Sequence, residues 1–143
     1  MKPIELISDN LSEEGLRMDV EIMPSADFMK QKGWNARTAP VFRTQALFDT
    51  GAKLCAVDQS VIEALGVQPY RTCPVKTPYQ TVQSEVYQLI FKLPGRKEYF
   101  PVTAVVADLS ADGYKAFIGR DFLRYCTLVY DGANEKGYLL VQK

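Results

Sequence analysis

The sequence contains no histidine, and this absence removes several kinds of catalysis at once. Its 143 residues include 17 Lys and Arg, 17 Asp and Glu, and no His. A Ser-His-Asp or Cys-His site within the chain is therefore excluded, as are His-Glu-x-x-His metalloprotease sites and Cys₂His₂ zinc fingers. If the protein is a hydrolase, its acid–base chemistry must come from carboxylates, Lys, Tyr or Cys.

The sequence also lacks an excess of positive charge. The formal net charge at pH 7 is zero, and no run of Lys and Arg occurs. Binding to nucleic acid needs a clustered surplus of basic residues that neutralises phosphates. Separated basic residues such as Lys30, Lys32 and Arg37 are more simply interpreted as solvated surface. We therefore expect no nucleic-acid partner.

Cysteine pairs and long apolar runs are missing too. Cys55, Cys73 and Cys126 are odd in number and widely spaced, which argues against a structural zinc site and favours three reduced thiols. No apolar stretch approaches the roughly 20 residues that a membrane span needs. The first six residues lack the sustained apolar run of a signal peptide. We therefore expect a cytoplasmic protein without a membrane partner.

Short stretches typical of β-strands recur along the chain. Residues 18–22 alternate apolar and charged side chains, as a half-buried strand does. Residues 68–78 contain three prolines, which favours a loop or an edge strand. The other strands that we expect cover residues 41–48, 81–93, 99–109, 117–119, 127–130 and 138–141.

Only a few short helices are expected between these strands. Ser25 is a suitable N-cap for a helix through residue 32, with Gly33 at its end. Asp58 is a suitable N-cap for residues 59–65, with Gly66 ending that helix. Residues 121–125 have room for one helical turn. The fold class is therefore mostly β, with several short strands at a spacing that suggests a small closed or sandwich-like barrel.

The most informative stretch is Asp49-Thr50-Gly51-Ala52, which follows the apolar residues 46–48 directly. Such a strand carries the Asp49 carboxylate into a half-buried place, where it needs a partner or a changed proton affinity. Thr50 can hydrogen-bond the backbone, and Gly51 permits a close approach by a ligand. The alternative is an ordinary turn after a strand, since Asp and Gly are common turn residues.

Two segments together resemble one protein family. Leu-Phe-Asp-Thr-Gly-Ala at residues 47–52 resembles the active-site loop of the retropepsin-like aspartic proteases, the retroviral-type family with a single lobe. Phe-Ile-Gly-Arg-Asp-Phe-Leu at residues 117–123 resembles the second signature of that family, which precedes its short C-terminal helix. The resemblance implies a small closed acid-protease-type β-barrel with one or two short helices, one lobe of a symmetric dimer. It divides the chain into a segment 1–15 without an assigned role and a protease domain 16–143.

The resemblance also implies an activity, namely hydrolysis of peptide bonds in a peptide or protein substrate by a homodimer. Aspartic catalysis takes two carboxylates that share one proton, and this chain has a single Asp-Thr-Gly. A two-fold axis supplies the second Asp49 from the other subunit. One Asp49 then acts as general base on a water molecule, while its partner protonates the leaving group. No metal and no cofactor are expected.

The resemblance assigns roles to the residues around Asp49. It implies that Thr50 locks the two loops across the axis and that the backbone of Gly51 and Ala52 binds the substrate. The residues implied as structural support are Ile118, Gly119, Arg120 and Asp121.

Two departures from the family pattern leave alternatives open. In the viral enzymes an acidic residue commonly follows the Asp-Thr-Gly-Ala string and pairs with the Arg of the Gly-Arg segment. Here that position is Lys53, so Arg120 needs another acid, with Asp58 and Asp121 as candidates. Lys53 itself either lines the substrate cleft or is a solvated lysine. The hairpin expected to cover the cleft, residues 76–87, contains no Gly. Its Tyr79 either contacts substrate or is an exposed aromatic residue.

Other hypotheses come from other classes. The same barrel without catalysis would serve as a peptide-binding or dimerisation module, which Lys53 and the Gly-free hairpin favour. Cys55 is a weaker candidate nucleophile, because no histidine is available to activate it. Residues 24–40, which hold the only Trp, are either a dimer contact, a cleft wall or a satellite hydrophobic cluster on the barrel.

Overall fold

The structure is a computed structural model that describes residues 2–76 and 78–142. Three residues lie outside the described part of the chain. They are residue 1 of the expected segment 1–15, residue 77 of the expected hairpin 76–87, and residue 143 at the end of the expected domain 16–143. The strands are β1 (Ile4–Glu5), β2 (Arg17–Pro24), β3 (Phe42–Phe48), β4 (Cys55–Asp58), β5 (Arg71–Lys76), β6 (Thr81–Lys92), β7 (Tyr99–Ala107), β8 (Ala116–Ile118), β9 (Cys126–Asp131) and β10 (Lys136–Val141). The helices are α1 (Leu11–Glu14), α2 (Ala26–Lys32), α3 (Gln59–Leu65) and α4 (Arg120–Leu123).

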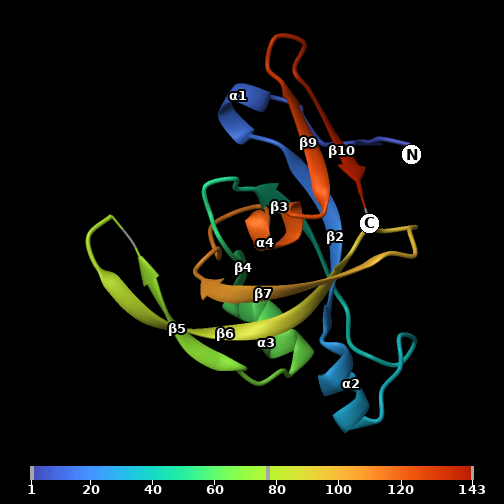
Figure 1. The fold of residues 1–143 in the computed structure, drawn as a ribbon, viewed down its shortest axis with the longest axis vertical. Helices are drawn as coiled ribbons and strands as arrows, with labels where there is room; N and C mark the ends of the chain where they lie inside the picture. Colours follow the sequence, from blue (N-terminus) through green and yellow to red (C-terminus); the bar gives the residue numbers. More distant parts are fainter. Residues whose placement is uncertain (1, 77, 143) are drawn as a thin grey trace.

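Seven of the strands form one sheet that closes on itself. Their order is β2-β3-β8-β4-β7-β6-β5, and β2 also pairs with β6, which joins the two sides into a ring (Figure 1). Of these seven strands, β5 stands outside the ring, as the outer strand of a hairpin with β6. A closed ring leaves few unpaired strand edges. The expected small closed β-barrel is therefore confirmed.

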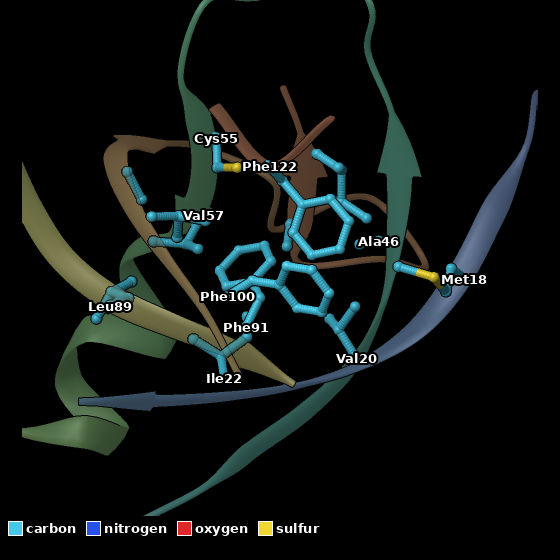
Figure 2. Packing of buried hydrophobic residues seen from close by; sticks show 14 of the residues in the cluster. Met18, Val20, Ile22, Ala46, Cys55, Val57, Leu89, Phe91, Phe100 and Phe122 are labelled. Carbon is cyan, nitrogen blue, oxygen red and sulfur yellow. The ribbon is translucent and has the colours of Figure 1, made fainter. Parts of the chain in front are cut away.

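The inside of the barrel is filled by aromatic and aliphatic side chains. Figure 2 shows the rings of Phe91, Phe100 and Phe122 together at its centre, and the ring centroids of Phe100 and Phe122 are 4.5 Å apart. All three rings are fully buried, and burial of one such side chain stabilises the fold by about 1.5–3 kcal/mol. Met18, Val20 and Ile22 enter the same core from β2, while the residues between them do not. The alternation predicted from the sequence is confirmed.

The expected helix caps are present. The Ser25 side chain accepts a hydrogen bond from the backbone N–H of Phe28, and Gly33 ends α2 in a left-handed conformation. The Asp58 carboxylate accepts from the backbone N–H of Ser60, and Gly66 ends α3 in the same way. The last helix, α4, begins one residue earlier than the sequence predicts and ends at Leu123.

The described part of the segment 1–15 is folded onto the rest of the chain. Strand β1 pairs with β10, and β10 pairs with β9 in a separate three-stranded sheet. Leu6 and Leu11 are buried in the main core, and Gly137 of β10 packs directly against the side chain of Leu16. The segment 1–15, which has no role assigned from the sequence, therefore supplies a strand and two core residues.

Residues 24–40 contribute to a satellite hydrophobic cluster on the barrel. Met23, Ala39 and Ile90 are its buried members, and Trp34 packs against them from the loop after α2. The ring of Trp34 also meets Phe28 of α2 edge-on, with 6.0 Å between centroids. Of the interpretations left open by the sequence, the structure favours the satellite hydrophobic cluster.

No helix within the part of the chain that the structure describes is long and apolar enough to cross a membrane.

Candidate active site

Asp49 stands directly after β3, at the point where this strand leaves the barrel wall. Strand β8 runs parallel to β3, and the backbone N–H of Asp49 donates a 2.9 Å hydrogen bond to the carbonyl of Ile118. The Asp49 carboxylate accepts from the N–H of Gly51 at 3.2 Å, and the N–H of Ala52 donates to the Asp49 carbonyl at 3.2 Å. The side chain is half-buried while Thr50 and Gly51 are exposed. A tight turn thus presents a carboxylate that solvent and ligands can reach.

Gly119 brings the second sequence motif against this turn. A Cβ built on Gly119 overlaps the carbonyl oxygen of Leu54 and lies 3.0 Å from the carbonyl oxygen of Ala52. Only a residue without a side chain allows this approach. The 117–121 segment and the Asp49 turn are therefore packed backbone to backbone, although some 70 residues separate them in the sequence.

Arg120 connects the same two segments through hydrogen bonds. Its N–H donates to the carbonyl of Ala52 at 2.9 Å, and its guanidinium donates to the carbonyl of Thr50 at 2.9 Å. No ion pair of Arg120 occurs within residues 2–76 and 78–142. The partner of Arg120 is thus a backbone carbonyl rather than either of the two carboxylates that the sequence suggests.

Those two carboxylates have other partners. Asp121 accepts a hydrogen bond from the N–H of Thr103 on β7, and its own N–H donates to the carbonyl of Lys53 at 3.0 Å. Asp58 is 6 % exposed and accepts from the hydroxyl and N–H of Ser60 and from the N–H of Leu109 at 2.8 Å. Hydrogen bonds from the Ser60 side chain, then from the Leu109 and Ser60 backbone, lower the pKa of Asp58. Asp121 therefore joins α4 to β7, and Asp58 joins the start of α3 to the loop after β7.

The two candidate cleft residues, Lys53 and Tyr79, are both exposed. The Lys53 side chain is exposed, and only its carbonyl takes part in the bracing contacts described above. Tyr79 lies at the tip of the β5–β6 hairpin, which extends away from the barrel (Figure 1), and its side chain is 95 % exposed. In the single chain, both candidate side chains are therefore exposed to solvent.

The sequence does not single out Leu47 and Phe117 as a pair, yet they lie beside Asp49. Leu47 pairs with Phe117 across β3 and β8, and Phe117 also pairs with Ala56 of β4. Both side chains are half-buried, in contrast to the fully buried Ala46 and Ile118 next to them. Leu47 and Asp49 are two residues apart along an extended chain and share one face of it. An apolar wall therefore adjoins the carboxylate.

Cys55 is excluded as a nucleophile. Its side chain is fully buried in the barrel core, and burial raises the pKa of its thiol to about 12. A thiol attacks as the thiolate, which such a site does not provide near neutral pH. No group of three or more His, Cys, Asp or Glu side chains among the described residues is arranged to hold a metal ion.

Comparison with known proteins supports the assignment of the fold. No protein-family model matches the sequence, and no curated protein matches it significantly. Among solved structures, the chain is similar to a retropepsin-like aspartic protease from Rickettsia conorii, with a TM-score of 0.58 and 13 % identity over 96 % of this chain and 90 % of that one.

Two viral enzymes are also similar, with lower TM-scores. The simian foamy virus protease has a TM-score of 0.48 and 20 % identity over 76 % of this chain and 92 % of that one. The EIAV protease has a TM-score of 0.45 and 21 % identity over 57 % of this chain and 75 % of that one. The match that spans nearly the whole chain carries the conclusion, which is that this chain has the fold of the retropepsin-like aspartic proteases.

Proposed function

We propose that the protein is a homodimeric aspartic endopeptidase whose catalytic pair consists of one Asp49 from each subunit. The observation that carries the proposal is the bracing of the Asp49 turn. Ile118 accepts a hydrogen bond from the Asp49 N–H, Arg120 donates to Thr50, and Gly119 packs against the carbonyl of Leu54. A carboxylate that is rigidly held and still reachable suits a catalytic group better than an ordinary surface turn does.

In this proposal the second carboxylate comes from a second copy of the chain, because the sequence holds one Asp-Thr-Gly and two other loop aspartates serve their own turns. The Asp108 carboxylate accepts from the hydroxyl and N–H of Ser110, and the Asp131 carboxylate accepts from the backbone and side chain of Asn134. Neither adjoins a second Asp-Thr-Gly sequence. A two-fold axis beside the Asp49 turn supplies the missing carboxylate from an identical subunit.

The three-stranded sheet offers a surface for such a dimer. Strand β9 is its edge on the side away from β10, and it carries Val129 and Tyr130, which are 38 % and 58 % exposed. An unpaired edge with exposed apolar residues is prone to pair with another chain. Gly137 of the neighbouring β10 packs on Leu16, whose carbonyl accepts from the N–H of Phe48 directly before Asp49. The sheet proposed to form the dimer is therefore connected to the Asp49 turn through Leu16 and Phe48.

The proposed mechanism uses the two carboxylates in different protonation states. Two carboxylates a few Å apart share one proton because like charges at that distance are not both stable. The ionised Asp49 removes a proton from a water molecule, which attacks the scissile carbonyl carbon. The protonated Asp49 of the other subunit donates a hydrogen bond to the carbonyl oxygen, and a proton then passes to the leaving amine. The rate should pass through a maximum with pH, set by the pair rather than by either residue.

The remaining parts of the proposed site are the turn and the hairpin. Thr50 contacts its counterpart across the axis, and the exposed backbone of Gly51 and of Ala52 binds the peptide. The β5–β6 hairpin covers the bound substrate and brings Tyr79 over it, while Lys53 at the rim favours acidic side chains. The three free thiols are compatible with the reducing cytoplasm, which is part of the same proposal.

The test is cleavage of a mixed peptide library between pH 3 and 8 by the wild type, Asp49→Asn and Asp19→Asn. Asp19 is an exposed residue of β2 and provides the matched control. We expect cleavage by the wild type and Asp19→Asn, and a loss of at least about a thousandfold in Asp49→Asn. Cleavage that survives Asp49→Asn contradicts the mechanism. A wild type that dimerises and cleaves nothing favours the peptide-binding or dimerisation module instead.

A further inference from the structure

The loop between β7 and β8, residues 108–115, is wrapped around the ammonium group of Lys115. The Nζ atom of Lys115 donates to three backbone carbonyls of this loop, to Leu109 at 2.8 Å, to Asp112 at 3.1 Å and to Ser110 at 3.2 Å. An ammonium has three N–H donors and no acceptor. The three carbonyls therefore use its full donor capacity.

The backbone of Lys115 is fixed at the same time on both sides. Its N–H donates to the hydroxyl of Thr44 on β3 at 3.0 Å, and its carbonyl accepts from the N–H of Asp58 on β4 at 2.9 Å. Thr44 and Asp58 belong to the two strands that flank β8. Lys115 thus joins the loop to the barrel at the residue directly before β8.

The charge of Lys115 also has counterparts in its surroundings. Asp108 and Asp112 are in the loop itself, and Asp58 holds the N–H of Leu109. For Asp108, the hydrogen bonds of Ser110 do most to lower the pKa, and the positive charge of Lys115 adds to them against the repulsion of Asp58. Without the ammonium, the carbonyl oxygens of Leu109, Ser110 and Asp112 would lose the donor that they share.

Strand β8 transmits the position of this loop to the Asp49 turn. It is only three residues long, Ala116–Ile118, and it starts immediately after Lys115. The carbonyl of its last residue, Ile118, accepts a hydrogen bond from the Asp49 N–H. Its middle residue, Phe117, is half-buried and pairs with Leu47 of β3. The ring centroids of Phe117 and of Tyr114 in the loop are 5.7 Å apart. A displacement at the start of so short a strand therefore reaches both Phe117 and Asp49.

We propose that Lys115 is a positioning residue whose ammonium acts as a tethered counter-cation, holding the 108–115 loop and, through β8, the Asp49 turn. The ammonium group rather than the aliphatic stem is responsible. Loss of its charge, by substitution or by acylation of the amine, loosens the loop and the Asp49 turn together while the rest of the barrel stays closed.

The first test does not depend on catalysis. Amide hydrogen exchange is measured in the wild type, in Lys115→Met, which keeps the stem, in Lys115→Arg, which keeps the charge, and in Lys97→Met, which removes an exposed lysine. We expect exchange about tenfold or more faster in Lys115→Met at the amides of Leu109, Asp112 and Asp49. Lys115→Arg should lie between Lys115→Met and the wild type, and Lys97→Met should match the wild type.

Two results would overturn the proposal. One is equal exchange in Lys115→Met and Lys97→Met at these amides. The other is an equal acceleration at Phe91 and Phe100 of β6 and β7, because that means general destabilisation rather than loss of a local anchor.

The second test is kinetic and rests on the proposed function. Lys115→Met should lower kcat about threefold to tenfold with a smaller change in KM, and Lys115→Arg should restore most of it. A normal kcat in Lys115→Met contradicts the positioning role. If the wild type cleaves no peptide, the proposed function fails, and hydrogen exchange still decides the role of Lys115.

Discussion

The α-carbon of Gly119 lies against the carbonyl group of Leu54, so close that a Cβ at residue 119 would overlap its oxygen. This contact joins the start of α4 to the end of the Asp49 turn. Two backbone bonds accompany it, from Arg120 to Ala52 and from Asp121 to Lys53. Packing of backbone on backbone leaves no flexible side chain that can yield, so the turn has little freedom to shift.

Gly119→Ala is therefore expected to displace the Asp49 turn. Overpacking of a tight site costs about 1–3 kcal/mol, and we expect a loss of stability in that range together with loss of the proposed cleavage. Urea unfolding measures the first effect. Gly113→Ala is the control, because a Cβ there meets nothing within 4 Å and should change stability little. Equal stabilities for the two variants would contradict the close contact.

Arg120→Met should affect catalysis more than stability. The variant loses the 2.9 Å hydrogen bond to the Thr50 carbonyl, and a net cost of about 0.5–1.5 kcal/mol is expected for one exposed bond. Because Thr50 follows Asp49 directly, we expect kcat/KM to fall by about tenfold or more. Arg43→Met, which loses an exposed ion pair to Glu21, serves as the comparison. Wild-type cleavage by Arg120→Met would show that the Thr50 bond is dispensable.

Asp58 should make the fold sensitive to acid. Its pKa is lowered in the folded state, first by the Ser60 hydroxyl and then by the backbone N–H groups of Leu109 and Ser60. The ionised carboxylate therefore contributes stability above its ordinary value of 3.8, and this contribution is lost as the pH falls below it. In urea unfolding between pH 2.5 and 7, Asp58→Asn should be less stable than the wild type at pH 7 and converge toward it in acid. A constant difference over this range would contradict the linkage.

Val129→Lys should weaken the proposed dimer. A charge at this exposed position of β9 would be buried or repelled when a second copy pairs with the strand edge. We expect sedimentation equilibrium to give a dissociation constant at least about tenfold higher, equivalent to about 1.4 kcal/mol. Tyr70→Lys changes an exposed aromatic residue outside this sheet and should leave association unchanged. Equal association of both variants with the wild type would mean that β9 is not the interface.

The sequence predicted the parts of the fold that depend on local patterns. The alternation in β2, the Ser25 and Asp58 caps and the glycines that end α2 and α3 are all readable within a few residues. Strand β4 was not predicted, because its four residues are all buried and show no alternation. Strand β1 was not predicted either, because its two residues become a strand only by pairing with β10, more than 130 residues later.

The location of the candidate site is predictable from the sequence, but the contacts that hold it are not. Two sequence motifs pointed to one loop, and the structure packs them together through Gly119 and Arg120. The acceptor of the Arg120 guanidinium is the backbone carbonyl of Thr50. It is not predictable from the sequence, because a pattern of charged residues indicates only which side chains could pair. The hydrogen bonds of the Lys115 ammonium are not predictable from the sequence for the same reason, since its three acceptors are also backbone carbonyls.

The central claim is that each active site takes one Asp49 from each of two subunits. It is tested by mixing wild type with Asp49→Asn at constant total chain, allowing the subunits to exchange, and measuring cleavage against the wild-type fraction. A shared pair predicts activity proportional to the square of that fraction, so that an equal mixture keeps about a quarter of the wild-type rate. Activity proportional to the fraction itself, with about half the rate in the equal mixture, would contradict the claim.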